Sequence, residues 1–152
     1  MKDSTLYIYK PINPVLFSSS QSVSRDSRAL EVSLSKLDYF LSRLTTPFLS
    51  GNTMSHLDCE ILPKLHHLRV AAGVLKGYQI PARLSSVWRY LHQGYNSQVF
   101  SKSCPPDQEI LLHWADRPDT PTISTEDHSM LTRETPKFSF DIPAIAVPVN
   151  IV

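Results

Sequence analysis

The chain has 152 residues, of which 41% are hydrophobic and 19% charged, and its formal net charge at pH 7 is +1. This composition is typical of one globular domain with its own core rather than of a disordered chain. Lys plus Arg (15) nearly balance Asp plus Glu (14), so the chain lacks the basic surplus that a nucleic-acid partner requires.

The cysteine content and the apolar runs indicate the class of protein. Cys59 and Cys104 are too few for the disulfide framework of a small secreted domain, and they favour reduced thiols in a cytosolic protein. No apolar run approaches the ~18 residues that a transmembrane helix requires. The N-terminal residues lack the basic start and apolar stretch of a signal peptide. The sequence therefore predicts a soluble intracellular chain.

The first predicted helix covers residues 28–44. Before it, residues 1–27 are expected to form a partly irregular leader, because two prolines interrupt its short apolar run and serines fill positions 18–24. Along 28–44, leucines recur every three or four positions and therefore share one helix face. These leucines are Leu30, Leu34, Leu37, Leu41 and Leu44. Pro47 ends the helix, since the residue before a proline resists helical geometry.

A helix-capping signal precedes the second predicted helix, residues 56–75. Ser55 and Asp58 stand three positions apart before an apolar run, which is the layout of a capping box. In that arrangement the Ser55 oxygen accepts a hydrogen bond from the backbone near Asp58, and the carboxylate accepts one from the Ser55 N–H. Met54 and Cys59 stand where a hydrophobic staple would close, which predicts a buried and inert Cys59.

The helix over 56–75 has a broad apolar face, which indicates burial on several sides. Its apolar positions are Leu57, Ile61, Leu62, Leu65, Leu68, Val70 and Ala72. Pro63 lies inside the pattern and predicts a bend near the first turns. Gly73 and Gly77 loosen its end.

Three further helices are predicted before residue 117. Pro81 opens a helix over 82–95, with Trp88 as its largest core residue. A short helix carries Val99 and Phe100. Another begins after Pro105 and Pro106 and runs to Trp114, helped by acidic residues in its first turn.

Residues 118–152 differ in composition from the helical region, because they contain several prolines with Ser and Thr residues between them. The final apolar stretch has no helical or strand period. We therefore expect a Pro-rich tail that is largely disordered or loosely docked.

Candidate reactive groups do not combine into a recognisable active site. The histidines lack the spacing of a zinc site, although His56, Cys59 and His66 share part of one predicted helix surface. The six histidines are His56, His66, His67, His92, His113 and His128. No Gly-x-Ser-x-Gly elbow, Gly-rich phosphate loop or paired carboxylates occur. Both cysteines lie near predicted helix starts, where the helix dipole lowers a thiol pKa, so a regulatory redox role is an alternative to two inert thiols.

Residues 51–66 carry a family resemblance. Gly51, Ser55 and Asp58 before a buried helix resemble the start of the core helix in the C-terminal domain of glutathione-transferase-like folds. Residues 58–66 (Asp-Cys-Glu-Ile-Leu-Pro-Lys-Leu-His) are similar to a segment of the chloride intracellular channel (CLIC) family. Further blocks follow in that family's order, over a resemblance that covers about residues 28–114. These blocks are Gly77 to Pro81, Val87 to Leu91 and Ser103 to Ile110.

The resemblance implies an all-α fold over 28–117: a glutathione-transferase C-terminal-like helical bundle without the N-terminal thioredoxin-like domain of the family. It implies a CLIC-like protein, cytoplasmic and soluble, that associates with membranes and in the full-length family transports chloride. The family's redox motif, Cys-Pro-Phe-Ser or a relative of it, does not occur in this sequence. The resemblance therefore carries over no catalytic, cofactor-binding or metal-binding residue, and only Ser55 and Asp58 as a structural helix cap.

Two other functions stay open. A helical domain that normally docks on a second domain exposes an apolar face when alone, and the helix over 28–44 is the expected owner of that face. The chain could then be a non-catalytic scaffold that binds a protein partner there. A glutathione-dependent enzyme is the third reading, which the missing cysteine motif disfavours. The sequence is compatible with a fragment, a truncated gene product or a short variant.

Overall fold

The structure, a computed structural model, describes residues 23–117 and 122–144, with side chains from residue 27 onward. In these ranges the chain is helical, and its only strand-like contact is an isolated bridge between Phe48 and Gly51. The predicted all-α class is confirmed. The helical segments in chain order are α2 Val23–Ser42, α3 His56–His67, the π-helical η1 Leu68–Ala72, α4 Gly73–Lys76, α5 Ser85–Asn96, α6 Gln98–Ser103, α7 Asp107–Ala115 and α8 Thr125–Arg133.

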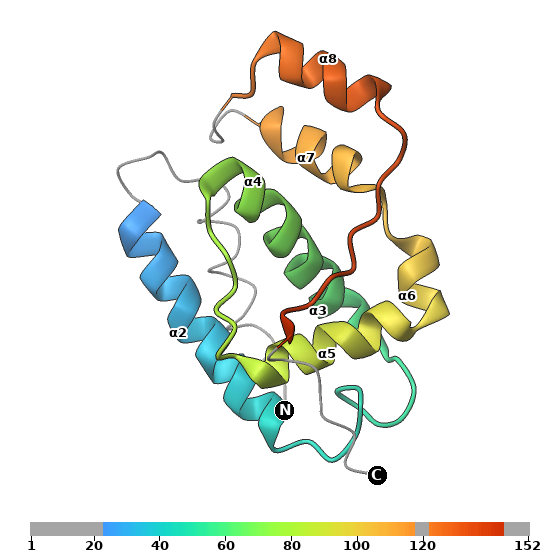
Figure 1. The fold of residues 1–152 in the computed structure, drawn as a ribbon. Helices are drawn as coiled ribbons and strands as arrows, with labels where there is room; N and C mark the ends of the chain where they lie inside the picture. The colour runs from blue at the N-terminus through green and yellow to red at the C-terminus, as the bar shows by residue number, and fades with distance from the viewer. Residues whose placement is uncertain (1–22, 118–121, 145–152) are drawn as a thin grey trace.

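The centre of the molecule is a nearly continuous helical rod made of α3, η1 and α4 (Figure 1). The rod matches the predicted helix over 56–75, and it ends at Gly77, whose φ of 63° is the left-handed conformation that glycine adopts most readily. Leu62, Leu65 and Leu68 are completely buried in it. α5 and α7 pack against the rod, and the leucines of α2 belong to the same core cluster, so its apolar face is covered from several sides.

α2 crosses the N-terminal turns of α5 and closes one side of the core (Figure 1). Its buried residues are the predicted leucine stripe: Leu30, Leu34, Leu37 and Leu41. The helix begins at Val23, five residues before the predicted start at residue 28, and ends at Ser42. The predicted leader over 1–27 otherwise lies outside the described residues.

The first turn of α5 is capped by a residue from a different helix. Its own N-cap residue, Leu84, has no polar side chain. Instead, Asp38 of α2 accepts hydrogen bonds from the backbone N–H groups of Ser86 (2.8 Å) and Val87 (2.9 Å) through one carboxylate oxygen. A carboxylate at a helix N-terminus satisfies free N–H groups and interacts favourably with the helix dipole. This contact fixes α2 against α5.

The largest difference from the sequence-based prediction lies after residue 121. Residues 125–133, predicted as part of an irregular tail, form α8, and Ser124 caps it by accepting from the Asp127 N–H at 3.0 Å. The chain then runs back in extended form across α7 towards α5 (Figure 1). Phe140 and Ile142 of this segment pack against the core. Residues 118–121 and 145–152 of the predicted tail lie outside the described residues.

A close helix contact gives the first testable prediction. A Cβ atom on Gly94 of α5 would lie 2.8 Å from Cδ2 of the fully buried Leu62. Overpacking of this kind costs roughly 1–3 kcal/mol, and the better helix propensity of alanine recovers about 1 kcal/mol. We expect Gly94→Ala to lower the free energy of unfolding in urea by about 1 kcal/mol.

Gly73 provides the matched control, because it is also helical and a Cβ atom there meets only the Tyr78 carbonyl oxygen at 3.8 Å. Gly73→Ala should raise stability by about 0.5–1 kcal/mol. Equal effects of the two substitutions would contradict a close α3–α5 contact.

Candidate functional site

The predicted capping box is present at the start of the central rod. Ser55 is the N-cap of α3 and Asp58 is its third helical residue. The Ser55 backbone N–H donates to Asp58 Oδ2 at 2.8 Å, and the Ser55 hydroxyl donates to the same oxygen at 2.6 Å. Two donors therefore converge on one carboxylate oxygen, as expected where a hydroxyl faces an ionised partner.

The second oxygen of Asp58 ties the cap to two other parts of the fold, which the sequence did not indicate. Oδ1 accepts from the Leu49 backbone N–H at 3.0 Å and from the Tyr90 hydroxyl at 2.7 Å. Tyr90 belongs to α5, in one of the sequence blocks that had no assigned role. Asp58 is completely buried, so four hydrogen bonds compensate the loss of water around its charge.

The electrostatics of this cluster follow from burial and hydrogen bonding. Burial alone would raise the pKa of Asp58, but the bonds from Leu49, Ser55 and Tyr90 outweigh it and hold the pKa below its ordinary value of 3.8. Burial, with the hydrogen bond to Asp58 as a second cause, raises the pKa of the Tyr90 hydroxyl far above its ordinary value. Asp58 is thus a structural hydrogen-bond acceptor that favours its ionised form.

The predicted hydrophobic staple is wrong at its second residue. Met54 packs against the core, but Cys59 is exposed and does not cover it. The reason is the helical register: Asp58, Ile61, Leu62 and Leu65 point inward, and Cys59 falls on the outer face of α3. Both cysteines are free.

The position of Cys104 before a helix suggested a lowered thiol pKa, but the structure indicates a raised one. Burial raises the pKa of its thiol to about 11, and the Asp107 carboxylate adds to the effect. A negative charge in the first turn of α7 therefore opposes the helix dipole.

Thiol labelling tests this difference between the cysteines. At pH 7.5 a pKa of about 11 leaves well under a thousandth of Cys104 as the reactive thiolate. We expect the exposed Cys59 to react with an aromatic disulfide reagent at least ten times faster than Cys104. Cys59→Ser should remove the fast phase and Cys104→Ser should retain it; the opposite pattern would contradict this assignment.

The histidines do not converge on a metal site. Within the described residues no group of three or more His, Cys, Asp or Glu side chains could hold a metal ion. His56 and Cys59 are exposed on α3, whereas His66, which the sequence placed near them, is buried. His66 Nδ1 lies 3.1 Å from the Tyr95 hydroxyl, and His67 Nδ1 accepts from the Trp114 indole N–H at 3.2 Å.

The buried His66 and the partly buried His67 both favour the neutral form. Burial, with a smaller contribution from the nearby Arg69 guanidinium, lowers the pKa of His66 to about 4. Burial also lowers the pKa of His67, with a smaller contribution from His113. These side chains therefore contribute to packing rather than to surface charge at pH 7.

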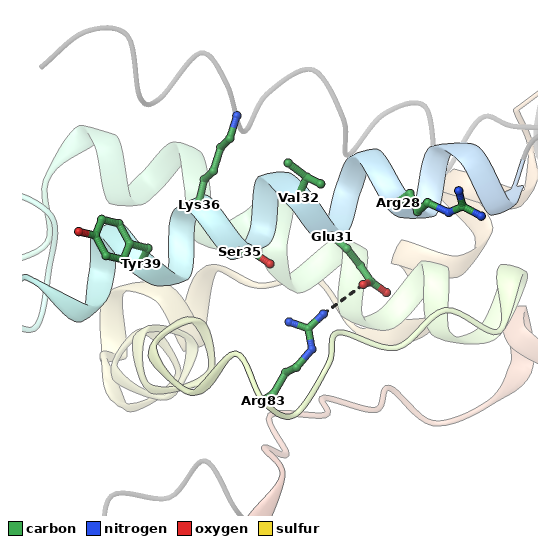
Figure 2. A pocket seen from close by; sticks show the side chains of 7 residues that line it. All are labelled: Arg28, Glu31, Val32, Ser35, Lys36, Tyr39 and Arg83. Carbon is green, nitrogen blue, oxygen red and sulfur yellow. Dashed lines mark hydrogen bonds and ion pairs between the residues drawn. The ribbon is translucent and has the colours of Figure 1, made fainter.

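One open hollow lies along the outer face of α2. It has a volume of about 550 Å³ and is lined by Arg28, Glu31, Val32, Ser35, Lys36, Tyr39 and Arg83. Val32 and Tyr39 are 55% and 65% exposed. Figure 2 shows Arg83, from the chain before α5, pointing at Glu31, to which it forms an ion pair at 3.1 Å. The mixture of two exposed apolar residues and several charges suits a protein contact better than a small-molecule site.

None of the described helices combines the length and the apolar character that crossing a membrane requires.

Known proteins place this fold in a family. No protein-family model matches the chain. It is 47% identical over 120 residues to chloride intracellular channel exl-1 of Caenorhabditis elegans, covering 79% of this chain and 50% of that protein. It is 38% identical over 117 residues to chloride intracellular channel Clic of Drosophila melanogaster, covering 77% and 43%. The chain thus spans about half the length of these curated relatives.

Solved structures agree with the sequence relatives. The CLIC homologue EXC-4 from C. elegans superimposes with a TM-score of 0.82 at 25% identity, over 95% of this chain and 57% of that one. A dehydroascorbate reductase from Chlamydomonas reinhardtii has a TM-score of 0.68 at 23% identity, over 75% of this chain and 54% of that one, which is a likeness of fold alone. The chain therefore belongs to the chloride intracellular channel family and has the glutathione-transferase-like helical fold of that family's C-terminal domain.

Proposed function

We propose that this chain acts as the helical domain of a CLIC-type protein whose chloride transport requires a further domain. The observation that carries the proposal is the partial match: the chain aligns with half of exl-1 and 57% of the EXC-4 chain. The described helices also lack a membrane-spanning candidate. On this proposal the domain is cytoplasmic, associates with membranes together with its partner domain, and is not itself an enzyme. The partly buried thiol of Cys104, whose pKa is raised to about 11, supports the last point.

Chloride efflux from liposomes tests the proposal. We expect the 152-residue chain alone to give no efflux above empty vesicles, and a fusion that adds the unmatched half of exl-1 to give efflux. The same fusion carrying Asp58→Ala, which destabilises the helical domain, is the control that shows whether efflux depends on the folding of this domain. Efflux from the chain alone, or none from the folded fusion, would reject the proposal.

The hollow on α2 favours a second candidate function, a non-catalytic interaction scaffold. Val32 and Tyr39 are exposed there beside the Glu31–Arg83 ion pair, so an apolar contact could be surrounded by charges that set its orientation. We propose the unmatched half of exl-1 as the test partner. Its binding to this chain should weaken at least tenfold with Val32→Lys.

Val99→Lys is the matched control, because Val99 is also more than half exposed but lies on α6, outside the hollow. Equal binding of both variants would remove the hollow from the contact.

A further inference from the structure

The segment that follows α8, residues 134–142, is called the strap here. It is held mainly through its backbone. The side-chain amide of Gln108 contacts it twice: Nε2 donates to the Thr135 carbonyl oxygen at 2.7 Å, and Oε1 accepts from the Lys137 N–H at 3.0 Å. Both groups of one buried amide are therefore satisfied by the strap backbone.

The contacts continue along the strap at every second residue. The Asp107 N–H donates to the Lys137 carbonyl oxygen at 2.8 Å, and the Asp107 carboxylate accepts from the Ser139 N–H at 3.2 Å. Arg69 of η1 donates to the carbonyl oxygens of Ser139 and Asp141, the latter at 3.4 Å. This spacing of two is the period of an extended strand, so the surface recognises extended backbone.

Two strap side chains, Phe140 and Ile142, pack against the core, and Phe140 makes the ring contacts. The Phe140 ring lies 5.0 Å from the Tyr95 ring and 5.7 Å from the His66 ring, between centroids. Phe138, two residues earlier, is 50% exposed. We name Arg69, His66, Tyr95, Asp107 and Gln108 the strap-binding surface. It requires an extended segment with an aromatic residue at one position.

The element that leads into the strap is weakly attached. α8 has no buried residue, and its Leu131 packs against the core while only partly buried. Its ion pair, His128 to Asp116 at 3.5 Å, is between side chains about half or more exposed, which contributes little to stability. Segments with few buried contacts open at low free-energy cost, so α8 and the strap can leave while the helical core persists.

We propose that the strap-binding surface is a recognition site for an extended, aromatic-containing segment of a protein partner, and that the strap of this chain occupies it as an intramolecular competitor. Backbone hydrogen bonds supply affinity and the ring pocket supplies selectivity, as in other modes of extended-peptide recognition. The partner segment cannot have proline at the positions of Lys137 or Ser139, because their N–H groups donate to the surface. This proposal is independent of chloride transport and of the hollow on α2.

A labelled peptide with the sequence of residues 134–143 tests the proposal on the full chain. Phe140→Ala in the chain weakens the strap and leaves the strap-binding surface intact. Because an occupied site lowers apparent affinity, the peptide should bind this variant at least tenfold more tightly than the wild-type chain in fluorescence anisotropy. Phe138→Ala is the matched control chain, and it should bind the peptide as weakly as the wild type.

Peptide variants define the recognition. A peptide with Ala at the position of Phe140, or with Pro at the position of Ser139, should bind the Phe140→Ala chain at least tenfold more weakly. Equal binding of all peptides, or none to the Phe140→Ala chain, would overturn the proposal. A concentration-dependent dimer of the wild-type chain that exchanges its straps would overturn it too, since a second copy would then be the occupant.

Hydrogen exchange on the wild-type chain gives a test that needs no variant. The Lys137 and Ser139 amides should exchange faster than those of α3, and excess peptide should accelerate them by capturing the open state. Exchange of these amides only by global unfolding, unaffected by peptide, would overturn the proposal.

Discussion

We expect Asp58→Ala to lower the free energy of unfolding by about 3 kcal/mol, and to move the midpoint of urea unfolding accordingly. The substitution removes the acceptor of four hydrogen bonds and leaves the Tyr90 hydroxyl and the Leu49 N–H facing a buried space. Each unsatisfied buried donor costs roughly 1–3 kcal/mol, and loss of a helix cap costs about 1 kcal/mol.

The chain contains its own control for this experiment. Ser124 and Asp127 at the start of α8 repeat the Ser-x-x-Asp spacing, and the Ser124 hydroxyl donates to Asp127 at 2.7 Å, but the pair is exposed. Asp127→Ala should therefore cost less than about 1 kcal/mol. A double-mutant cycle with Tyr90→Phe should give a coupling energy above about 1 kcal/mol. Equal costs at Asp58 and Asp127 would contradict the role of burial.

We expect the second large effect at acidic pH, where His66 should lower the free energy of unfolding. In the unfolded chain this imidazole takes up a proton near pH 6.5, whereas in the folded protein burial keeps the pKa at about 4. The unfolded state therefore binds more protons between these values. The stabilisation is complete above pH 6.5 and falls by about 1.4 kcal/mol per pH unit as the pH drops towards 4, about 3 kcal/mol in all.

His66→Phe should remove most of this slope, because the ring still fills the pocket formed by Tyr95, Phe100 and Phe140 but cannot titrate. The remaining slope comes from His67, whose pKa burial also lowers. His66 Nε2 is buried without a hydrogen-bond partner, so the phenyl ring should cost little at pH 7.5 and be the more stable form at pH 4.5. His56→Gln, on the exposed face of α3, retains the buried imidazole and serves as the control. A wild-type stability that is flat from pH 6.5 to 4.5 would reject the assignment.

Much of the helical architecture could be predicted because its signals are local. The leucine stripe of α2 and the Ser55–Asp58 cap each lie within a few residues of sequence, and both are present in the structure. The same local signal occurs at Ser124 and Asp127, and it would have located α8 had the surrounding prolines not suggested an irregular tail. Composition was a poorer guide there than the capping spacing.

What the sequence did not reveal depends on partners distant along the chain. Tyr90 meets Asp58 across 32 residues, and Arg69 holds Ser139 across 70. Neither residue belongs to a motif whose spacing predicts its partner. The strap was missed for this reason: its backbone is satisfied by Asp107 and Gln108 rather than by a regular ladder, so it has no periodic pattern of its own.

The cap that Asp38 of α2 provides for α5 has a consequence for folding during synthesis. Asp38 emerges from the ribosome 48 residues before the amide of Ser86 that it serves. During that interval α2 has a leucine face and a carboxylate without their final neighbours, and α5 has no polar cap until the two meet. The pairing of α2 with α5 therefore cannot form until α5 has been synthesised, and the leucine face of α2 lacks this neighbour for as long as that takes.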